Sequence, residues 1–304
     1  MKILLSLFII LCLAIQGNAQ GVKSLQKASD KAQRIMKPKN EILIQSPVNL
    51  VNPFVGTGGH GHTFPGATAP FGMIQLSPDT RHEGWDGCSG YHYSDSVIYG
   101  FSHTHLSGTG VPDYCDLLIV PQSGKKAKVV PGYENEKGFG SRFSHSTEKA
   151  SPGYYEVFLE DDGIKAQMTT SERAGIHQYT FTREKDKKFI LIDFDHRDDL
   201  LFAEYILDGK KHISGQRTSN SWADEQHFYF DLEFSIEPSK IIRVKNKHGH
   251  KLLIQFPKET KTLSIAIGIS QVDEAGALKN RTTELDNFNF SKTKANTNSL
   301  WNKE

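Results

Sequence analysis

The sequence has 304 residues, with 36 Lys and Arg against 35 Asp and Glu, so its net charge at neutral pH is +1. A near-neutral chain has no global basic field, which excludes charge-driven binding to nucleic acid as its main function. Gly and Pro occur at ordinary frequencies, which excludes collagen-like and low-complexity chains, and only 37% of the residues are hydrophobic. We therefore expect a globular protein with a thin, two-layer core.

Residues 1–19 have the features of a secretory signal peptide. Lys2 precedes a mostly apolar run, and Ala19 places a small residue at the predicted cleavage point. No later run approaches the roughly 18 apolar residues of a membrane helix, so we expect no membrane span. The protein is predicted to be secreted, to the periplasm or the cell surface. Residues 20–46 are polar and rich in Lys and Arg, and we expect a flexible lead there.

Loops dominate the next part of the chain. Residues 51–110 hold 12 of the 26 glycines and 6 of the 13 histidines. Short strands are predicted within and just after this region, at 73–77, 98–103 and 117–120.

Further along, the pattern predicts strands. Apolar and polar residues alternate at 164–169 and 228–234, which gives each strand one apolar face that only a second sheet can bury. At 263–269 apolar residues alternate with small ones, which predicts a strand covered on both faces. Residues 47–290 are therefore predicted to form an all-β domain, a large antiparallel two-layer β-sandwich. Helical patterning is confined to 274–285 and to a short C-terminal segment from about 293.

Four loop segments combine glycine with His, Trp, Tyr and Asp, the composition of a polar pocket. They are Gly56–Gly66, Gly84–Tyr93, Gly100–Gly110 and Pro112–Asp116. Trp85, with Asp86 and Tyr91, offers what a sugar site needs: a flat ring for the apolar face of a pyranose and polar partners for its hydroxyls. The alternative is that Trp85 packs within the core or the loops.

The loop histidines suggest a second hypothesis, a metal-dependent hydrolase. His60 with His62, and His103 with His105, stand two residues apart, and such side chains share a face when they lie in a strand. Either Asp79 or Asp113 would complete a site for zinc or another transition metal. The alternative is that these histidines bind backbone groups or a ligand.

Acidic residues and cysteines leave further alternatives open. The carboxylate pair of a glycosidase has four candidates, although each is also a common loop hydrogen-bond acceptor. They are Asp79, Asp86, Asp113 and Asp116.

Beyond the signal peptide, Cys88 and Cys115 are the only thiols, and they are either free or joined by one disulfide bond.

The sequence from Val51 to Tyr114 closely resembles the N-terminal region of glycoside hydrolase family 92, secreted calcium-dependent exo-α-mannosidases. The segments Pro152–Phe181 and Ser219–Phe230 and the terminal SLWNKE are similar to that family too. The resemblance runs from about residue 47 to the end. It implies three parts in chain order: a β-sandwich, a helical linker whose first residues are 291–304, and an (α/α)6 barrel. The active site would lie between the sandwich and the barrel.

The resemblance also implies which residues act. The general acid, the general base and the calcium ligands of the inverting mechanism would lie in the barrel, so we expect no catalytic residue and no metal ligand in this chain, and no activity from it alone. Trp85 corresponds to the sugar-contacting tryptophan of the family. A wider set on the same and neighbouring loops would bind mannose hydroxyls or hold the loops: Asp86, Cys88, His92, His60, His62, His103 and His105.

The expected partners are mannose-containing glycans and the protein's own C-terminal barrel. An alternative from a different class is a stand-alone carbohydrate-binding β-sandwich, which would bind the same sugars without cleaving them.

Overall fold

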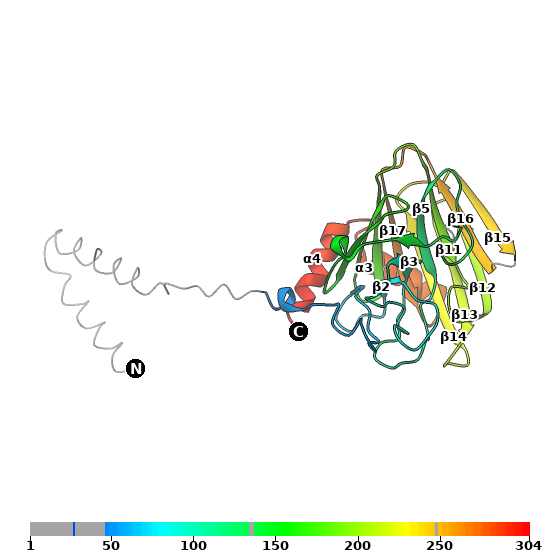
Figure 1. The fold of residues 1–304 in the computed structure, drawn as a ribbon. Coiled ribbons are helices and arrows are strands. Elements are labelled where there is room, and N and C mark those ends of the chain that lie inside the picture. Colours follow the sequence, from blue (N-terminus) through cyan, green and yellow to red (C-terminus); the bar gives the residue numbers. More distant parts are fainter. Residues whose placement is uncertain (1–26, 28–45, 134–136, 247–248) are drawn as a thin grey trace. The chain divides into compact units, whose positions relative to one another are not determined.

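The computed structural model describes residue 27 and residues 46–133, 137–246 and 249–304 (Figure 1). The chain divides into two units, residues 1–45 and residues 46–304, and the second holds the fold. The predicted signal peptide and almost all of the predicted lead lie outside the described residues. None of the described helices is long and apolar enough to cross a membrane.

Two antiparallel sheets form the second unit. The first has seven strands, in the order β1 (Ala67–Thr68), β2 (Gln75–Asp79), β4 (Gly100–Ser102), β5 (Leu118–Gly124), β11 (Lys187–Asp193), β16 (Gly249–Phe256) and β15 (Lys240–Asn246). The second has eight, in the order β12 (Asp199–Asp208), β13 (His212–Asn220), β14 (Gln226–Phe234), β17 (Thr262–Ser270), β10 (Ala174–Phe181), β9 (Ile164–Thr170), β8 (Tyr154–Leu159) and β7 (Lys149–Ser151). Smaller elements complete the list: a β3 (Val97–Ile98) and β6 (Ser141–Arg142) pair and the 3-10 turns η1 (Pro47–Leu50) and η3 (His145–Thr147).

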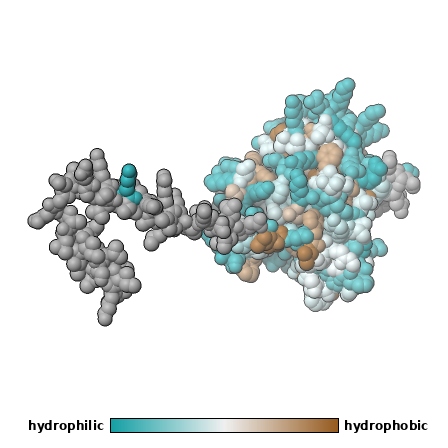
Figure 2. All heavy atoms as spheres, turned by 60° about the vertical axis from the view of Figure 1, so that its left-hand side comes forward, coloured by the Kyte–Doolittle hydropathy of each residue, from teal (hydrophilic) through white to brown (hydrophobic). Residues whose placement is uncertain are grey.

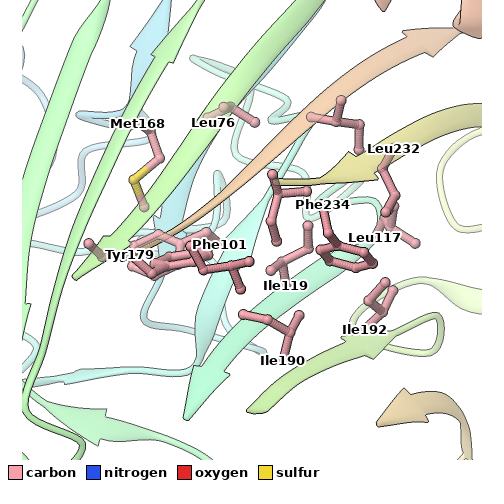
Figure 3. Close-up of a cluster of buried hydrophobic side chains, with 14 of the residues drawn as sticks. Leu76, Phe101, Leu117, Ile119, Met168, Tyr179, Ile190, Ile192, Leu232 and Phe234 are labelled. Atoms are coloured by element: carbon pink, nitrogen blue, oxygen red, sulfur yellow. The ribbon is translucent and has the colours of Figure 1, made fainter. Parts of the chain in front are cut away.

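The core lies between the two sheets. Leu76, Phe101, Ile119, Ile190 and Ile192 point inward from the seven-stranded sheet, and Met168, Tyr179, Leu232 and Phe234 meet them from the eight-stranded sheet (Figure 3). Successive side chains of a strand point to opposite faces, so the period-two alternation seen in the sequence becomes one buried face for each strand. The predicted two-layer sandwich is confirmed.

Two helices close the chain. α3 (Glu274–Glu284) begins at Asp273, whose side chain accepts a hydrogen bond from the Gly276 amide at 2.6 Å, and it packs across β17 and β14. A Cβ added at Gly268 would lie 2.3 Å from the Ala277 carbonyl oxygen, so only glycine lets the helix sit this close to β17. The predicted burial of both faces of this strand is confirmed. α4 (Phe290–Trp301) follows, and its role as the start of a linker stays a prediction.

Candidate functional site

The Gly/His-rich loops gather beside the short strands of the seven-stranded sheet, where backbone hydrogen bonds join them. The Tyr93 amide donates to the Thr57 carbonyl at 2.8 Å, the Gly108 amide to the His62 carbonyl at 2.7 Å, and the Gly87 amide to the Gly61 carbonyl at 3.3 Å. The Cys115 amide donates to the Thr104 carbonyl at 2.8 Å, so all four predicted segments are joined by direct backbone hydrogen bonds.

Trp85 stands on the surface of this loop cluster and is 57% exposed. The ring of His62 meets the indole edge-on, with centroids 4.3 Å apart. Gly110 lies against the indole too: its φ is +76°, and a Cβ there would come within 2.6 Å of Trp85 Nε1. Trp85 is therefore not a core residue. The loops pack against part of its ring, as the loop alternative expects, and they leave more than half of the residue open.

His60 and Asp86 form a polar pair beside Trp85. His60 Nδ1 lies 2.8 Å from Asp86 Oδ1, and the centroid of the His60 ring lies 5.7 Å from that of Trp85. This hydrogen bond lowers the pKa of Asp86, so its carboxylate is ionised at neutral pH. Both side chains are open to solvent, which leaves a donor and an acceptor free to bind a ligand next to the exposed ring.

His92 and Cys88 lie beneath this surface and hold the loops. Both ring nitrogens of His92 are engaged, Nε2 with the Gly59 carbonyl and Nδ1 with the Ser94 hydroxyl, each at 2.8 Å. Cys88 is buried, burial raises the pKa of its thiol, and its carbonyl accepts a hydrogen bond from Arg197 at 2.6 Å. Cys88 and Cys115 are both free thiols, which answers the open question of a disulfide bond.

His103 and His105 do not face the loop surface and do not share a face. β4 ends at Ser102, so the strand geometry that would align them is absent. His103 lies in the core, with Nδ1 2.8 Å from the Leu117 carbonyl and Nε2 3.1 Å from Nε2 of His177, and burial lowers its pKa to about 4. His105 turns the other way, its Nδ1 2.7 Å from the Ser89 carbonyl.

The proposed pairing of His103 with His105 at a metal ion is therefore wrong. Among the described residues, one group brings three potential ligand atoms within 4.8 Å of one another: Asp79, His105 and Cys115. Because Nδ1 of His105 faces a carbonyl oxygen, it carries its proton and is not free to bind a metal. Nη1 of Arg197 lies 3.3 Å from Cys115 Sγ, so a cation already occupies this position. One carboxylate, one nitrogen and one thiol also do not fit calcium, which prefers oxygen ligands.

The remaining carboxylates of the sequence analysis are buried within the loop framework. Asp79 pairs with His196 at 2.7 Å, and burial raises its pKa. Asp116 forms a buried ion pair with Arg217 and accepts from Thr104 at 2.7 Å. Asp86 alone of the four candidates is open to solvent.

Sequence reasoning missed Asp198, Arg217 and Trp222 at this site. Asp113 and Asp198 are both buried and both accept from the Tyr114 amide at 2.9 Å, and burial together with the Asp113 carboxyl raises the pKa of Asp198 to about 8. Trp222 is 66% exposed on the turn between β13 and β14, which Ser221 joins to the Pro112 carbonyl at 2.9 Å. Asp198, Arg217 and Trp222 lie outside the Gly/His-rich segments, so composition gave no signal for them.

Comparisons with known proteins agree on a family. A family model described as the glycosyl hydrolase family 92 N-terminal domain matches residues 50–270. A protein of Arthroderma benhamiae named as an uncharacterized secreted glycosidase is 27% identical over 289 residues, which cover 84% of this chain and 37% of that protein.

Solved structures give the same result. The chain is similar to a family GH92 α-mannosidase of Bacteroides thetaiotaomicron, with 35% identity, a TM-score of 0.80, and coverage of 86% of this chain and 38% of the mannosidase. That mannosidase has also been solved in complex with mannoimidazole. An inverting family GH92 mannosidase of the same organism shares the fold at 23% identity, with a TM-score of 0.72 and coverage of 87% and 36%. The chain thus spans little more than a third of the length of each relative.

Proposed function

The chain belongs to the family of glycosyl hydrolase family 92 N-terminal domains, and we propose that it supplies the sugar-recognition surface of a secreted, inverting exo-α-mannosidase acting on mannose-rich glycans. The relatives extend well beyond the part that this chain matches. The proposed catalytic acid, catalytic base and calcium ligands belong to that following part, a helical barrel. The chain alone is then inactive.

The exposed Trp85 carries the proposal. An aromatic face packs well against the apolar C–H face of a pyranose, and more than half of Trp85 is open. The His60–Asp86 pair beside it offers a donor and an ionised acceptor for sugar hydroxyls. A mannosidase relative that binds mannoimidazole supports mannose as the sugar.

The state of the carboxyl groups supports placing catalysis in the following domain. An inverting glycosidase needs a protonated carboxylic acid and a carboxylate about 6.5–9.5 Å apart, with a water between one of them and the sugar. Asp86 is open to solvent, but its lowered pKa keeps it ionised, so it has no proton to donate at neutral pH. Asp198 keeps a proton at neutral pH, but it is buried against Asp113, which is buried too. Asp79 and Asp116 are buried and bonded to other side chains. The contribution of this chain is therefore to bind and orient the sugar.

The test compares Trp85→Ala with Trp85→Phe in a polypeptide extended through the following domain. Removing a ring that is half-buried by sugar should cost roughly 2 kcal/mol, about thirty-fold in kcat/KM for α-mannosides. Trp85→Phe keeps a flat ring and should lose much less. Unchanged kinetics in Trp85→Ala would refute the assignment.

A second assay uses the 304-residue protein and an α-linked mannobiose. We expect no release of mannose. Release would place the catalytic carboxylates in this chain, whereas tight binding without release in a chain that has no following domain would favour the carbohydrate-binding alternative.

A further inference from the structure

Phe71 is the most exposed large apolar residue of the described chain, at 97% exposure. It lies in the turn Ala69–Gly72, which a hydrogen bond from the Gly72 amide to the Ala69 carbonyl closes at 3.0 Å. Its φ is 53°, in the left-handed region that a bulky side chain rarely adopts. The exposed Phe71 ring and its left-handed backbone do not stabilise this domain. Strained backbone conformations of this kind concentrate at functional positions.

The turn is held firmly despite this exposure. The amides of Met73 and Ile74 both donate to the Glu172 carbonyl, at 2.7 and 3.3 Å, which fixes the turn against the connection between β9 and β10. A groove of about 300 Å³ adjoins it, lined by Glu172, Arg173 and Leu300 among others. Phe71 is therefore a fixed apolar projection beside a hollow.

Other exposed apolar residues lie at η1 and directly after the turn. Leu50 ends η1, Val51 follows it, and Met73 follows the turn. We call Leu50, Val51, Phe71 and Met73 the Phe71 patch. Figure 2, which brings the side of the molecule carrying α4 forward, shows brown apolar atoms on that side.

The last turn of α4 connects the two parts of the patch. The Trp301 indole donates to the Thr68 carbonyl at 2.8 Å, next to the Phe71 turn. The following residue, Asn302, accepts from the Val48 amide of η1 at 3.3 Å. A polypeptide that continues past α4, as the lengths of the relatives imply, thus emerges within the patch.

The patch also connects with the candidate sugar site. Phe54, three residues after Val51, packs edge-on against Tyr93, with ring centroids 5.8 Å apart. The Tyr93 amide in turn donates to the Thr57 carbonyl at 2.8 Å. One body resting on the Phe71 patch would therefore extend toward the loops that carry Trp85.

We propose that the Phe71 patch is the surface on which the catalytic domain that follows α4 docks, with Phe71 inserted into an apolar pocket of that domain. This inference rests on the proposed function, because that function supplies the following domain. In this domain alone, nothing offsets the cost of exposing the Phe71 ring and of holding its backbone in the left-handed region. Burial of Phe71 against the following domain would offset that cost. The docking holds the barrel over the Trp85 loops.

The first test replaces Phe71 with the photo-reactive p-benzoylphenylalanine in the polypeptide as its gene encodes it. Irradiation should cross-link this residue to positions beyond residue 304 of the same molecule. Cross-links between two copies, cross-links to residues 1–45, or none, would overturn the inference. Because this readout does not depend on catalysis, an active enzyme that still depends on Trp85 but gives no such cross-link would refute the docking surface alone. The expected cross-link in a protein that releases no mannose would refute the proposed function.

The second test compares Phe71→Asn in two contexts, because asparagine accepts a positive φ readily. In the 304-residue protein the Tm should not fall, since Phe71 packs against nothing there. In the complete enzyme the Tm should fall and kcat/KM should drop several-fold. The matched control is Ile206→Ala, an exposed apolar residue of β12 outside the patch, which should change neither measurement. Equal effects of Phe71→Asn in both contexts would contradict the proposal.

Discussion

Replacing Asp198 with asparagine should flatten the dependence of stability on pH. Asp198 and Asp113 are buried and share the Tyr114 amide, and the pKa of Asp198 is raised from its ordinary 3.8 to about 8. Between these two values the folded protein keeps a proton that the unfolded chain has lost. The free energy of unfolding therefore falls as pH rises through this window, by at most about 1.4 kcal/mol per pH unit.

The magnitude follows from the window. Between pH 5 and pH 7 the free energy of unfolding falls at nearly this maximum rate. The rise from pH 5 to pH 7 should therefore lower the contribution of Asp198 to stability by about 2.5 kcal/mol. An asparagine amide can donate to Asp113 as the protonated acid does, but it does not titrate. The stability of Asp198→Asn relative to the wild type should thus rise by about 2.5 kcal/mol over these two pH units.

Urea denaturation of the 304-residue protein, followed by tryptophan fluorescence at pH 5, 6 and 7, measures this difference. Asp199→Asn is the matched control, because Asp199 is the next residue and is exposed. Its curve should run parallel to that of the wild type. Parallel curves for Asp198→Asn as well would refute the reasoning, since they would mean that the buried pair holds no extra proton.

Three further outcomes are expected. Gly90→Ala should lower the free energy of unfolding by about 3 kcal/mol, because its φ is +101° and its Cβ would lie 2.5 Å from Asp79 Oδ1; Gly84→Ala, with φ +94° and open space, should lose only about 1 kcal/mol in the same urea titration, and equal losses would contradict the steric argument. Arg217→Met should lose about 3–5 kcal/mol, because it leaves the Asp116 carboxylate buried without its cation; a near-neutral result in urea denaturation would show that Asp116 is protonated or hydrated. The purified 304-residue protein should hold no stoichiometric zinc by elemental analysis after dialysis, and one zinc per chain would overturn our assignment of the His105 proton.

The fold was largely accessible from sequence. Alternation at 164–169 and 228–234 predicts strands with one buried face, and both segments lie within strands of the sandwich core. The small residues at 263–269 predicted cover on both faces, and α3 provides it. Local patterning suffices here because the pleat itself determines which side each residue faces.

The candidate site was accessible only in part. His60–His62 and His103–His105 show the same spacing in the sequence. The first pair lies beside Trp85 at the surface. The second pair follows the end of β4 and is buried, and its two rings face different partners. His103 owes its place to His177, 74 residues away. No local pattern encodes such a partner.

Composition and periodicity by themselves predicted the two-layer sandwich and the region that forms the loop surface, and they singled out Trp85 as a candidate sugar contact. Tertiary structure alone decided that Trp85 is open, that His103 is buried, that Asp198 keeps a proton and that Phe71 projects into solvent. Periodicity reflects the backbone geometry of one strand, which nearby residues specify. Exposure and protonation depend on which distant segments pack against a side chain, and that is settled only when the loops and sheets come together.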